Sequence, residues 1–158
     1  MLDTYLTTPI GTLKIIGTNT HVENILFYKD PLSNLKNLYQ RNVFPYPILE
    51  QLNEYFSGER YSFDLIISTT GSPFQRKVWS TLKSIPYGKT ASYTDIALKI
   101  GRLKAVRSVA TAIGKNPLPI VIPCHRVVGK NGTLNGYSGG LEIKQFLLNH
   151  EKTTSERC

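Results

Sequence analysis

A cysteine stands directly before a histidine in a short, proline-containing segment, at Cys124 and His125. Pro117, Pro119 and Pro123 precede the pair, so this segment cannot be helical and follows a stiff, extended path. A free thiol, with a pKa of about 8.5, attacks well only after a base or positive surroundings have brought it towards the thiolate. The adjacent imidazole is such a base, so the pair predicts a nucleophilic cysteine.

The alternative for Cys124 is a purely structural role. A single cysteine in an apolar run is more often an inert buried side chain than a nucleophile, and the same caution applies to His125. The stiff loop, the neighbouring base and Arg126 favour a chemical role. His125 would act directly or through a water molecule if a carboxylate orients it. Glu151, which we expect after the last helix, is the candidate among the four acidic residues of the second half.

Two short helices are predicted ahead of this segment, after an earlier helix over residues 73–84. Ser92 and Asp95 have the spacing of a capping box, so a helix begins there and ends at Gly101. A second helix is expected from about Leu103 to Ile113. Two short helices joined by a glycine-containing turn in a basic segment are typical of a helix-turn-helix, although helical hairpins without that role are common.

The second of these helices separates apolar from polar residues. Its apolar arc is predicted to face the core. The opposite face has three cations, small hydroxyl residues and no acid, so it can approach a phosphate backbone. The alternative is an ordinary solvated face. The arc consists of Leu103, Val106, Val109, Ala110 and Ile113, and the opposite face of Lys104, Arg107, Ser108, Thr111 and Lys115.

The first half of the chain is predicted to mix strands with one helix. Apolar runs between turn-forming residues indicate the strands, and helical spacing followed by Gly58 indicates the helix. Turn formers over 68–73 predict a linker, so the expected domains are 1–70 and 71–158. The predicted elements are strands over 13–16, 25–28 and 63–67 and a helix over 48–57.

Charge is distributed unevenly along the 158 residues, whose formal net charge is +8. Up to residue 70 there are five basic and seven acidic residues, and from residue 71 onwards there are fourteen basic and four acidic residues. Such asymmetry indicates a polyanionic partner, most simply nucleic acid. The alternative is a lysine-rich surface that only provides solubility.

The composition excludes several classes of protein. Hydrophobic residues make up 41% and charged residues 19%, which is typical of a globular chain and not of a disordered one. The apolar runs are too short to cross a bilayer, and no secretory leader is recognisable. Two cysteines, Cys124 and the terminal Cys158, rule out a disulfide scaffold and offer no metal-ligand spacing. We expect a cytoplasmic protein without a metal or cofactor.

The segment Pro123–Val127 resembles the active-site signature of the methylated-DNA–protein-cysteine methyltransferases, also called O6-alkylguanine-DNA alkyltransferases. The resemblance is close over residues 73–151 and looser before them. The surrounding segments that resemble the family in order and spacing are 87–93, 105–109, 114–117, 137–141 and 147–151.

The resemblance implies a fold of the α/β (α+β) class. An N-terminal ribonuclease H-like α/β domain would be followed by a mostly helical, winged helix-turn-helix domain. Such proteins bind duplex DNA through the minor groove, flip O6-alkylguanine out of the stack and transfer its alkyl group irreversibly to their own cysteine. Because the resulting thioether has no easy hydrolytic exit, each molecule would act once. The resemblance implies a monomer that needs no cofactor, no metal and no membrane.

The resemblance also implies roles for individual residues. Cys124 matches the alkyl acceptor, His125 the base that activates it through water, and Glu151 the carboxylate that orients the histidine. Arg107 matches the arginine that fills the hole left by the extruded base. Tyr93 matches the tyrosine that helps to rotate the nucleotide and protonates the leaving guanine.

Further matching residues surround the substrate. Asn116 matches the asparagine that links the helix-turn-helix to the active-site loop. The guanine would be read by backbone groups at Cys124, Val127 and Ser138, with Tyr137 as a wall of the pocket and Gly139 in a tight turn. The expected DNA contacts are Lys104, Ala105, Arg107, Ser108, Thr111 and Tyr93.

Three other functions fit part of the sequence. A non-catalytic relative that only binds alkylated DNA would lack the cysteine. A hydrolase with a Cys-His-Glu triad would turn over and would not need a basic helix face. A transcription regulator would need base-reading side chains where this chain has small hydroxyls and phosphate-type cations. The sequence therefore favours a single-use DNA-repair alkyltransferase.

Overall fold

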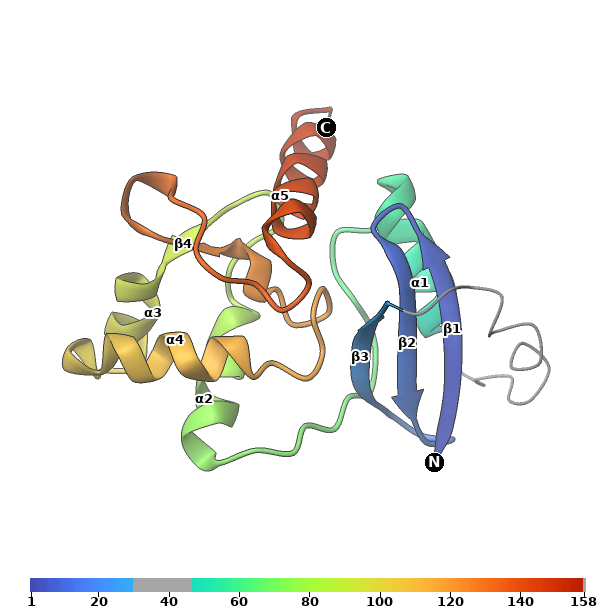
Figure 1. The fold of residues 1–158 in the computed structure, drawn as a ribbon, viewed down its shortest axis with the longest axis horizontal. Helices are drawn as coiled ribbons and strands as arrows, with labels where there is room; N and C mark the ends of the chain where they lie inside the picture. The colour runs from blue at the N-terminus through green and yellow to red at the C-terminus, as the bar shows by residue number, and fades with distance from the viewer. Residues whose placement is uncertain (30–46, 158) are drawn as a thin grey trace. The chain divides into compact units, whose positions relative to one another are not determined.

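The computed structural model describes residues 1–29 and 47–157, which fall into two compact units, Met1–Thr69 and Thr70–Cys158 (Figure 1). The terminal Cys158 lies outside the described residues. The predicted class is confirmed, since a unit of mixed α and β structure is followed by a mostly helical one. No helix among the described residues is long and apolar enough to span a membrane.

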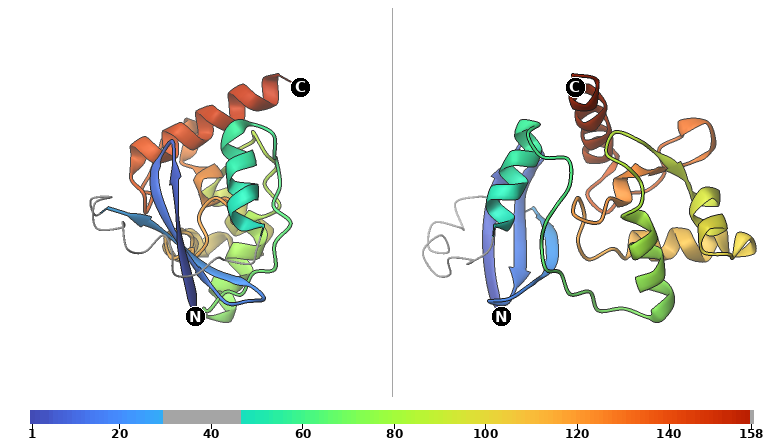
Figure 2. Two further views of the ribbon diagram at one scale, coloured as in Figure 1. Left: turned by 90° about the vertical axis from the view of Figure 1, so that its right-hand side faces the viewer. Right: turned by 180° about the vertical axis from the view of Figure 1, so that it is seen from behind.

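The N-terminal unit is an antiparallel sheet with one helix packed against it, as the two views of Figure 2 show. Two strands and the helix were predicted, and β1 was not. Leu13 and Ile15 on β2 are completely buried because alternate residues of a strand face the same side. The elements are β1 (Leu2–Thr8), β2 (Gly11–Gly17), β3 (Val22–Tyr28) and α1 (Ile48–Ser57), and the strand order is β1-β2-β3.

Gly58 ends α1 in the left-handed conformation, with a φ of 84°, as its position after the helix predicted. The predicted strand over 63–67 is wrong, because only Ile67 bridges to Val22. The buried side chain of Gln51 explains the difference: it accepts a hydrogen bond from the Asp64 backbone N–H and donates one to the Asp64 carbonyl, both at 2.9 Å. These backbone groups are therefore satisfied by a helix side chain and not by a neighbouring strand.

The C-terminal unit contains the predicted pair of short helices after α2. Capping boxes begin both α2, at Ser72, and α3, at Ser92, where the Ser92 hydroxyl accepts from the Asp95 N–H at 3.0 Å. The predicted helix over 73–84 ends two residues early. The elements are α2 (Pro73–Leu82), β4 (Ala91–Ser92), α3 (Tyr93–Lys99), η2 (Leu103–Ala105), α4 (Val106–Gly114), η3 (Cys124–Arg126), β5 (Val127–Val128), η4 (Lys130–Gly132) and α5 (Leu141–Glu156).

The second predicted helix begins with the 3₁₀ turn η2 and becomes α-helical only at Val106. Val109 and Ile113 are buried as predicted, and Val106 is half-buried. Leu103 was predicted to face the core but is 52% exposed, and Ala112 is buried instead. A 3₁₀ turn has three residues per turn instead of 3.6, so Leu103 is rotated away from the apolar stripe that follows.

The last helix carries Glu151 inside it, and the prediction that this residue follows the last helix is wrong. No Gly or Pro stands between Leu147 and Glu156 to end the helix, so it continues. Glu151 shares the buried side of α5 with Lys144, Leu147 and Thr154. This placement turns the carboxylate into the interior, where it meets η3.

Candidate active site

The proline-containing loop that precedes η3 is held together by one amide side chain. Asn116 donates from Nδ2 to the Ile122 carbonyl at 2.8 Å and accepts from the Leu118 backbone N–H at 3.0 Å. The Ile122 N–H in turn bonds the Leu118 carbonyl at 2.8 Å. Asn116 lies two residues after the end of α4, and both of its side-chain hydrogen bonds go to the loop that leads to Cys124.

The same loop contains a conformation that β-branched residues rarely adopt. Ile120 has a φ of 75° and is only 1% exposed. Such a conformation is strained for isoleucine, so packing of the buried side chain must hold it in place. The loop is therefore shaped by burial as well as by its prolines, and it brings Cys124 to a fixed position at the start of η3.

The pairing of β4 with β5 joins the segment that precedes α3 to the segment that follows η3. Ala91 pairs with Val127 and Ser92 with Val128, in parallel. Tyr93, the first residue of α3, is thereby placed next to the strand that follows the Cys-His pair. Val127 is completely buried in this connection.

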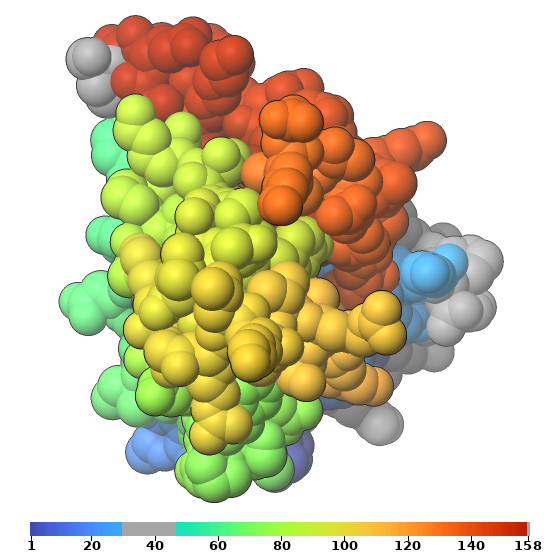
Figure 3. All heavy atoms as spheres, turned by 90° about the vertical axis from the view of Figure 1, so that its left-hand side faces the viewer, coloured from blue at the N-terminus to red at the C-terminus, as the bar shows by residue number. Residues whose placement is uncertain are grey.

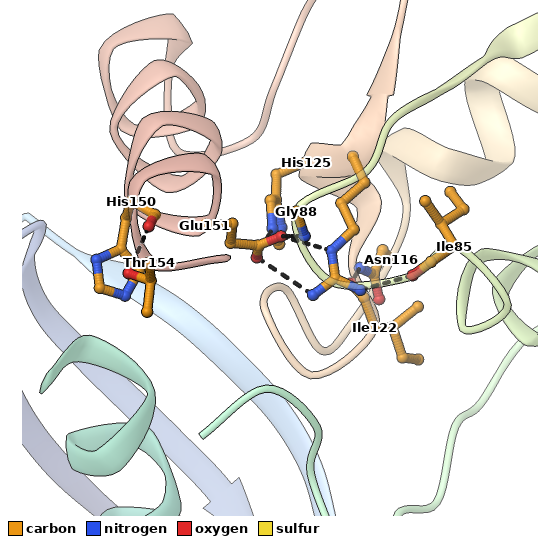
Figure 4. A network of polar contacts seen from close by, with 9 residues as sticks. Ile85, Gly88, Asn116, Ile122, His125, His150, Glu151 and Thr154 are labelled. Atoms are coloured by element: carbon orange, nitrogen blue, oxygen red, sulfur yellow. Dashed lines mark hydrogen bonds and ion pairs between the residues drawn. The ribbon is translucent and has the colours of Figure 1, made fainter. Parts of the chain in front are cut away.

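Glu151 joins His125 to the interior of the unit (Figure 4). His125 Nε2 lies 2.6 Å from Glu151 Oε2, and the two side chains are 0% and 1% exposed. His125 Nδ1 is buried and has no hydrogen-bond partner within the described residues. An Nε2–H donor to the carboxylate therefore leaves the lone pair of Nδ1 as the free proton acceptor of the ring.

Burial and charge set the protonation states of this pair. Burial lowers the pKa of His125, although the carboxylate of Glu151 opposes that shift. Burial alone would raise the pKa of Glu151, but its hydrogen bonds and charge interactions with His125 and Arg126 lower it to about 2. At neutral pH the site therefore holds a carboxylate against a neutral imidazole, which is the form that accepts a proton.

Cys124 is 5% exposed, and burial raises the pKa of its thiol to about 11. A hydrogen bond with the Asn116 side chain and the charge of Lys144 act in the opposite direction. The thiol is therefore protonated at neutral pH and needs a base before it can attack.

Lys144 is a site residue that the sequence analysis missed. It is 1% exposed, donates from Nζ to the Asn135 carbonyl at 3.2 Å, and interacts electrostatically with Cys124. Burial lowers its pKa. Its position on the buried side of α5, seven residues before Glu151, was the signal that could have found it.

Two tyrosines predicted for the site both interact with Cys124. Burial and the charge of an ionised Cys124 raise the pKa of Tyr93. Burial, with the charges of Cys124 and Glu151, raises the pKa of Tyr137 well above its ordinary value. Both hydroxyls therefore remain protonated at neutral pH, and each can donate a proton or a hydrogen bond. Ser138 is exposed and Gly139 half-buried in the segment between Tyr137 and α5.

A pocket of about 600 Å³ lies beside Tyr93 and Arg107. Its wall combines polar groups with the half-buried apolar side chains of α4. The lining residues are Tyr93, Val106, Arg107, Ala110, Gly114, Asn135 and Gly136.

The polar face of η2 and α4 is exposed, as the space-filling view of Figure 3 shows for these elements. Thr111 donates to the Arg107 carbonyl at 3.1 Å, whereas the exposed guanidinium of Arg107 has no hydrogen bond or ion pair with the described residues. Among the described residues, no group of three or more His, Cys, Asp or Glu side chains could hold a metal ion. The exposed members of the predicted DNA-contact set are Lys104, Arg107, Ser108 and Thr111, and Ala105 is half-buried.

Comparison with known proteins identifies both units. The family described as 6-O-methylguanine DNA methyltransferase, ribonuclease-like domain matches residues 1–69, and the corresponding DNA binding domain family matches residues 73–153. A constitutive methylated-DNA–protein-cysteine methyltransferase of Bacillus subtilis is 44% identical over 153 residues, covering 92% of each chain. A methylated-DNA–protein-cysteine methyltransferase of Mycolicibacterium paratuberculosis is 43% identical over 148 residues, covering 93% of this chain and 90% of the relative.

A solved structure with the same fold contains nucleic acid. The Mycobacterium tuberculosis OGT in complex with DNA has a TM-score of 0.85 and 38% identity, and the match covers 95% of this chain and 92% of that one. The fold and the site thus define a DNA-binding repair protein that works by alkyl transfer. The chain belongs to the 6-O-methylguanine DNA methyltransferase family, whose curated relatives are named methylated-DNA–protein-cysteine methyltransferases.

Proposed function

We propose that this protein repairs O6-alkylguanine in duplex DNA by moving the alkyl group irreversibly onto Cys124. The observation that carries the proposal is the buried contact of 2.6 Å between His125 and Glu151. It leaves His125 Nδ1, one residue from the thiol, as a proton acceptor with no partner in the described part of the chain. A structural cysteine needs no such base. The names of the relatives support the same reaction.

The reaction we propose is a single displacement at carbon. His125 Nδ1 takes the thiol proton, directly or through a water molecule, while Glu151 holds the ring and stabilises the imidazolium that forms. The sulfur of Cys124 then bonds to the alkyl carbon as the bond between that carbon and guanine O6 breaks. Tyr93 donates a proton to the departing guanine, which would otherwise leave as an anion. The products are a thioether and restored guanine, so each molecule reacts once.

The DNA-binding role that we propose rests on the exposed face of α4. Extruding a base from the duplex costs a few kcal/mol, and a side chain that replaces it in the stack lowers that cost. Arg107 is suited to this task because its exposed guanidinium stands at the edge of the pocket that also contains Tyr93. Lys104, Ser108 and Thr111 would contact the backbone on either side of the minor groove, and Ala105 would allow close approach.

The remaining substrate contacts are proposed for the residues around Cys124. Asn116 would hold the loop, and backbone groups at Val127 and Ser138 would read the guanine. Tyr137 would form a wall of the pocket and Gly139 the turn behind it.

We assign domain boundaries at 1–70 and 71–158, with the first domain supporting the second. We also propose a monomer that works in the cytoplasm, since repair requires access to the chromosome. Sedimentation of the protein with and without duplex DNA tests whether it is a monomer, and cell fractionation tests whether it is cytoplasmic.

The decisive experiment mixes the protein with an excess of duplex DNA that contains O6-methylguanine, followed by intact and peptide mass analysis. We expect one methyl group per molecule, on the Cys124 peptide, and no further reaction. Cys124→Ala, the matched control, should remain unmodified and still bind the lesion. A Cys158→Ser variant, which removes the second thiol, should react like the unaltered protein. Methylation that persists in Cys124→Ala would refute the mechanism, and lesion binding without methylation of the unaltered protein would favour a binding-only role.

A further inference from the structure

Arg126 is a buried cation that the proposed reaction does not yet use. Its side chain is 8% exposed, and its Nε donates to Glu151 Oε1 at 2.7 Å. One of its terminal nitrogens donates to Glu151 Oε2 at 3.3 Å, and the other donates to the Ile85 carbonyl at 2.7 Å. The guanidinium also lies over the ring of Tyr87, 5.6 Å from its centroid. Three groups therefore meet around the guanidinium, because Arg126 contacts Glu151, the Ile85 carbonyl and the ring of Tyr87.

The Glu151 carboxylate has two side-chain partners, His125 and Arg126. Oε1 accepts from Arg126 Nε, and Oε2 is shared by His125 and a terminal nitrogen of Arg126, so the planar guanidinium fixes the carboxylate plane. The Gly88 N–H approaches Oε1 from a third direction, at 3.4 Å (Figure 4). Without the Arg126 contacts, the carboxylate could rotate away from the single hydrogen bond that orients the imidazole.

The charge of Arg126 acts on His125 in the opposite sense to that of Glu151. The carboxylate favours the imidazolium, whereas the guanidinium beside it disfavours a second positive charge. The charged or titratable groups that interact with His125 are Glu151 and Lys144 from α5 and Arg126 from its own turn, η3, which also carries the Cys124 thiol. A histidine facing Glu151 alone would gain a proton more readily and would then be unable to accept one from the thiol.

We infer that Arg126 is a positioning residue for the alkyl transfer, which locks the Glu151 carboxylate against His125 and keeps the imidazole neutral until the thiol gives up its proton. The inference rests on the proposed function, since it concerns the base of that reaction. It predicts a change in the pH dependence of the reaction. A purely structural role, in which Arg126 only ties α5 to the Ile85 carbonyl after α2, predicts no such change.

The test measures the single-turnover rate of Cys124 methylation against pH for the active fraction of each variant. Arg126→Met removes the charge, so the acid limb of the profile should move upward by about one pH unit. At neutral pH the rate should fall several-fold and recover as the pH is raised. Arg126→Lys retains a charge but cannot bridge Glu151 and Ile85 with the same fork. Its acid limb should stay near that of the unaltered protein, with a lower plateau.

The matched control is Arg60→Met, which removes a second arginine–glutamate pair. Arg60 Nε lies 3.1 Å from Glu54 Oε2 in the N-terminal unit, with both side chains partly exposed. This variant should leave the pH profile unchanged. An acid limb of Arg126→Met that coincides with that of the unaltered protein would overturn the inference.

If Arg126→Met does not fold, the ring ¹⁵N shifts of His125 in Arg126→Lys and in the unaltered protein decide the question. Protonation of the ring in the unaltered protein at neutral pH would overturn the inference, and a neutral ring with its proton on Nε2 would support it. Absence of Cys124 methylation in the unaltered protein is a separate result, because it refutes the proposed function and not the placement of Arg126.

Discussion

The loop that carries Cys124 and the polar face of α4 are both parts of the C-terminal unit, yet their physical environments are opposite. His125, Arg126 and Glu151 are buried, and they are joined by hydrogen bonds between 2.6 and 3.3 Å. Lys104 and Arg107 are exposed, as are the small hydroxyl residues Ser108 and Thr111. The first region sets protonation states through desolvation, and the second keeps its charges in solvent, where a polyanion can reach them.

The difference explains why one unit can contain both functions. A thiol at the surface would react with any electrophile, whereas burial keeps Cys124 protonated until a base removes its proton. A buried cationic face would be costly and could not meet phosphates. The pairing of β4 with β5 connects the segment that begins α3 to the segment that follows the Cys124 turn, so both regions belong to one packed unit.

The largest effect is expected for the carboxylate of the buried region. Glu151→Gln removes the charge that orients His125 and leaves the Arg126 guanidinium buried without its counter-ion. We expect a loss of about 3 kcal/mol in the free energy of unfolding and a methylation rate about 100-fold lower. Denaturant unfolding and single-turnover kinetics measure the two effects. Glu54→Gln, in the partly exposed pair with Arg60, should change both by much less. Equal losses in the two variants would contradict the distinction.

Acid should destabilise the buried region before it affects the exposed face. The folded pKa of Glu151, about 2, lies below its ordinary value of 4.5, so its stabilising contribution is present above pH 4.5 and is lost as the pH falls towards 2. The pKa of His125 is lowered too, so stability already begins to fall below pH 6.5. The shift of Glu151 corresponds to about 3 kcal/mol. About 2 kcal/mol of this should be lost between pH 7 and pH 3. Denaturant unfolding over that range measures the loss, and an unchanged profile in Glu151→Gln would show that another group is responsible.

A smaller effect is expected for Arg107 on the exposed face. Arg107→Ala removes the side chain that we propose replaces the extruded base, so methylation from duplex DNA should slow by about 10-fold, or about 1.4 kcal/mol. The reaction with free O6-methylguanine base should change little, because no stack is opened. The ratio of the two rates is the measurement. Lys152→Ala, an exposed lysine on α5 outside the proposed contacts, is the control. An equal loss on both substrates for Arg107→Ala would remove its proposed role.

The smallest effect is expected for a single phosphate contact. Lys104→Ala should weaken binding to any duplex a few-fold and reduce the slope of log K against log salt by about 1. The measurement is a salt titration of binding to unmodified duplex DNA. Lys152→Ala, an exposed lysine on α5, serves as the control and should leave the slope unchanged. A reduced slope for Lys152→Ala and not for Lys104→Ala would place the DNA on a different face.

Local chemistry made part of the fold predictable. The capping box at Ser92 and Asp95 and the glycine after α1 act over three or four residues, so the sequence alone locates those helix ends. The predictions failed where distant residues decide. Gln51, from α1, takes the backbone groups of Asp64 away from any strand, and no pattern within 63–67 shows this.

The candidate site, like the fold, could be predicted only in part from the sequence. The signature at Pro123–Val127 resembled a known family, and through it Cys124, His125 and Glu151 could be named from the sequence. Lys144 was missed, because a lysine on an amphipathic helix is ordinarily solvated and its seven-residue spacing from Glu151 was the one signal of burial. Only the packing of α5 against η3 buries it beside the thiol.

The sequence by itself determined the kinds of chemistry available to this protein: a thiol next to an imidazole on a stiff loop, and a basic helix face without acids. These properties depend on residue type and short-range spacing. Tertiary structure decided the protonation states, because they depend on burial and on charges brought from α5. It also decided that Arg126 and His125 share one carboxylate, since Glu151 lies twenty-five residues from Arg126 in the chain and only 2.7 Å from it in space.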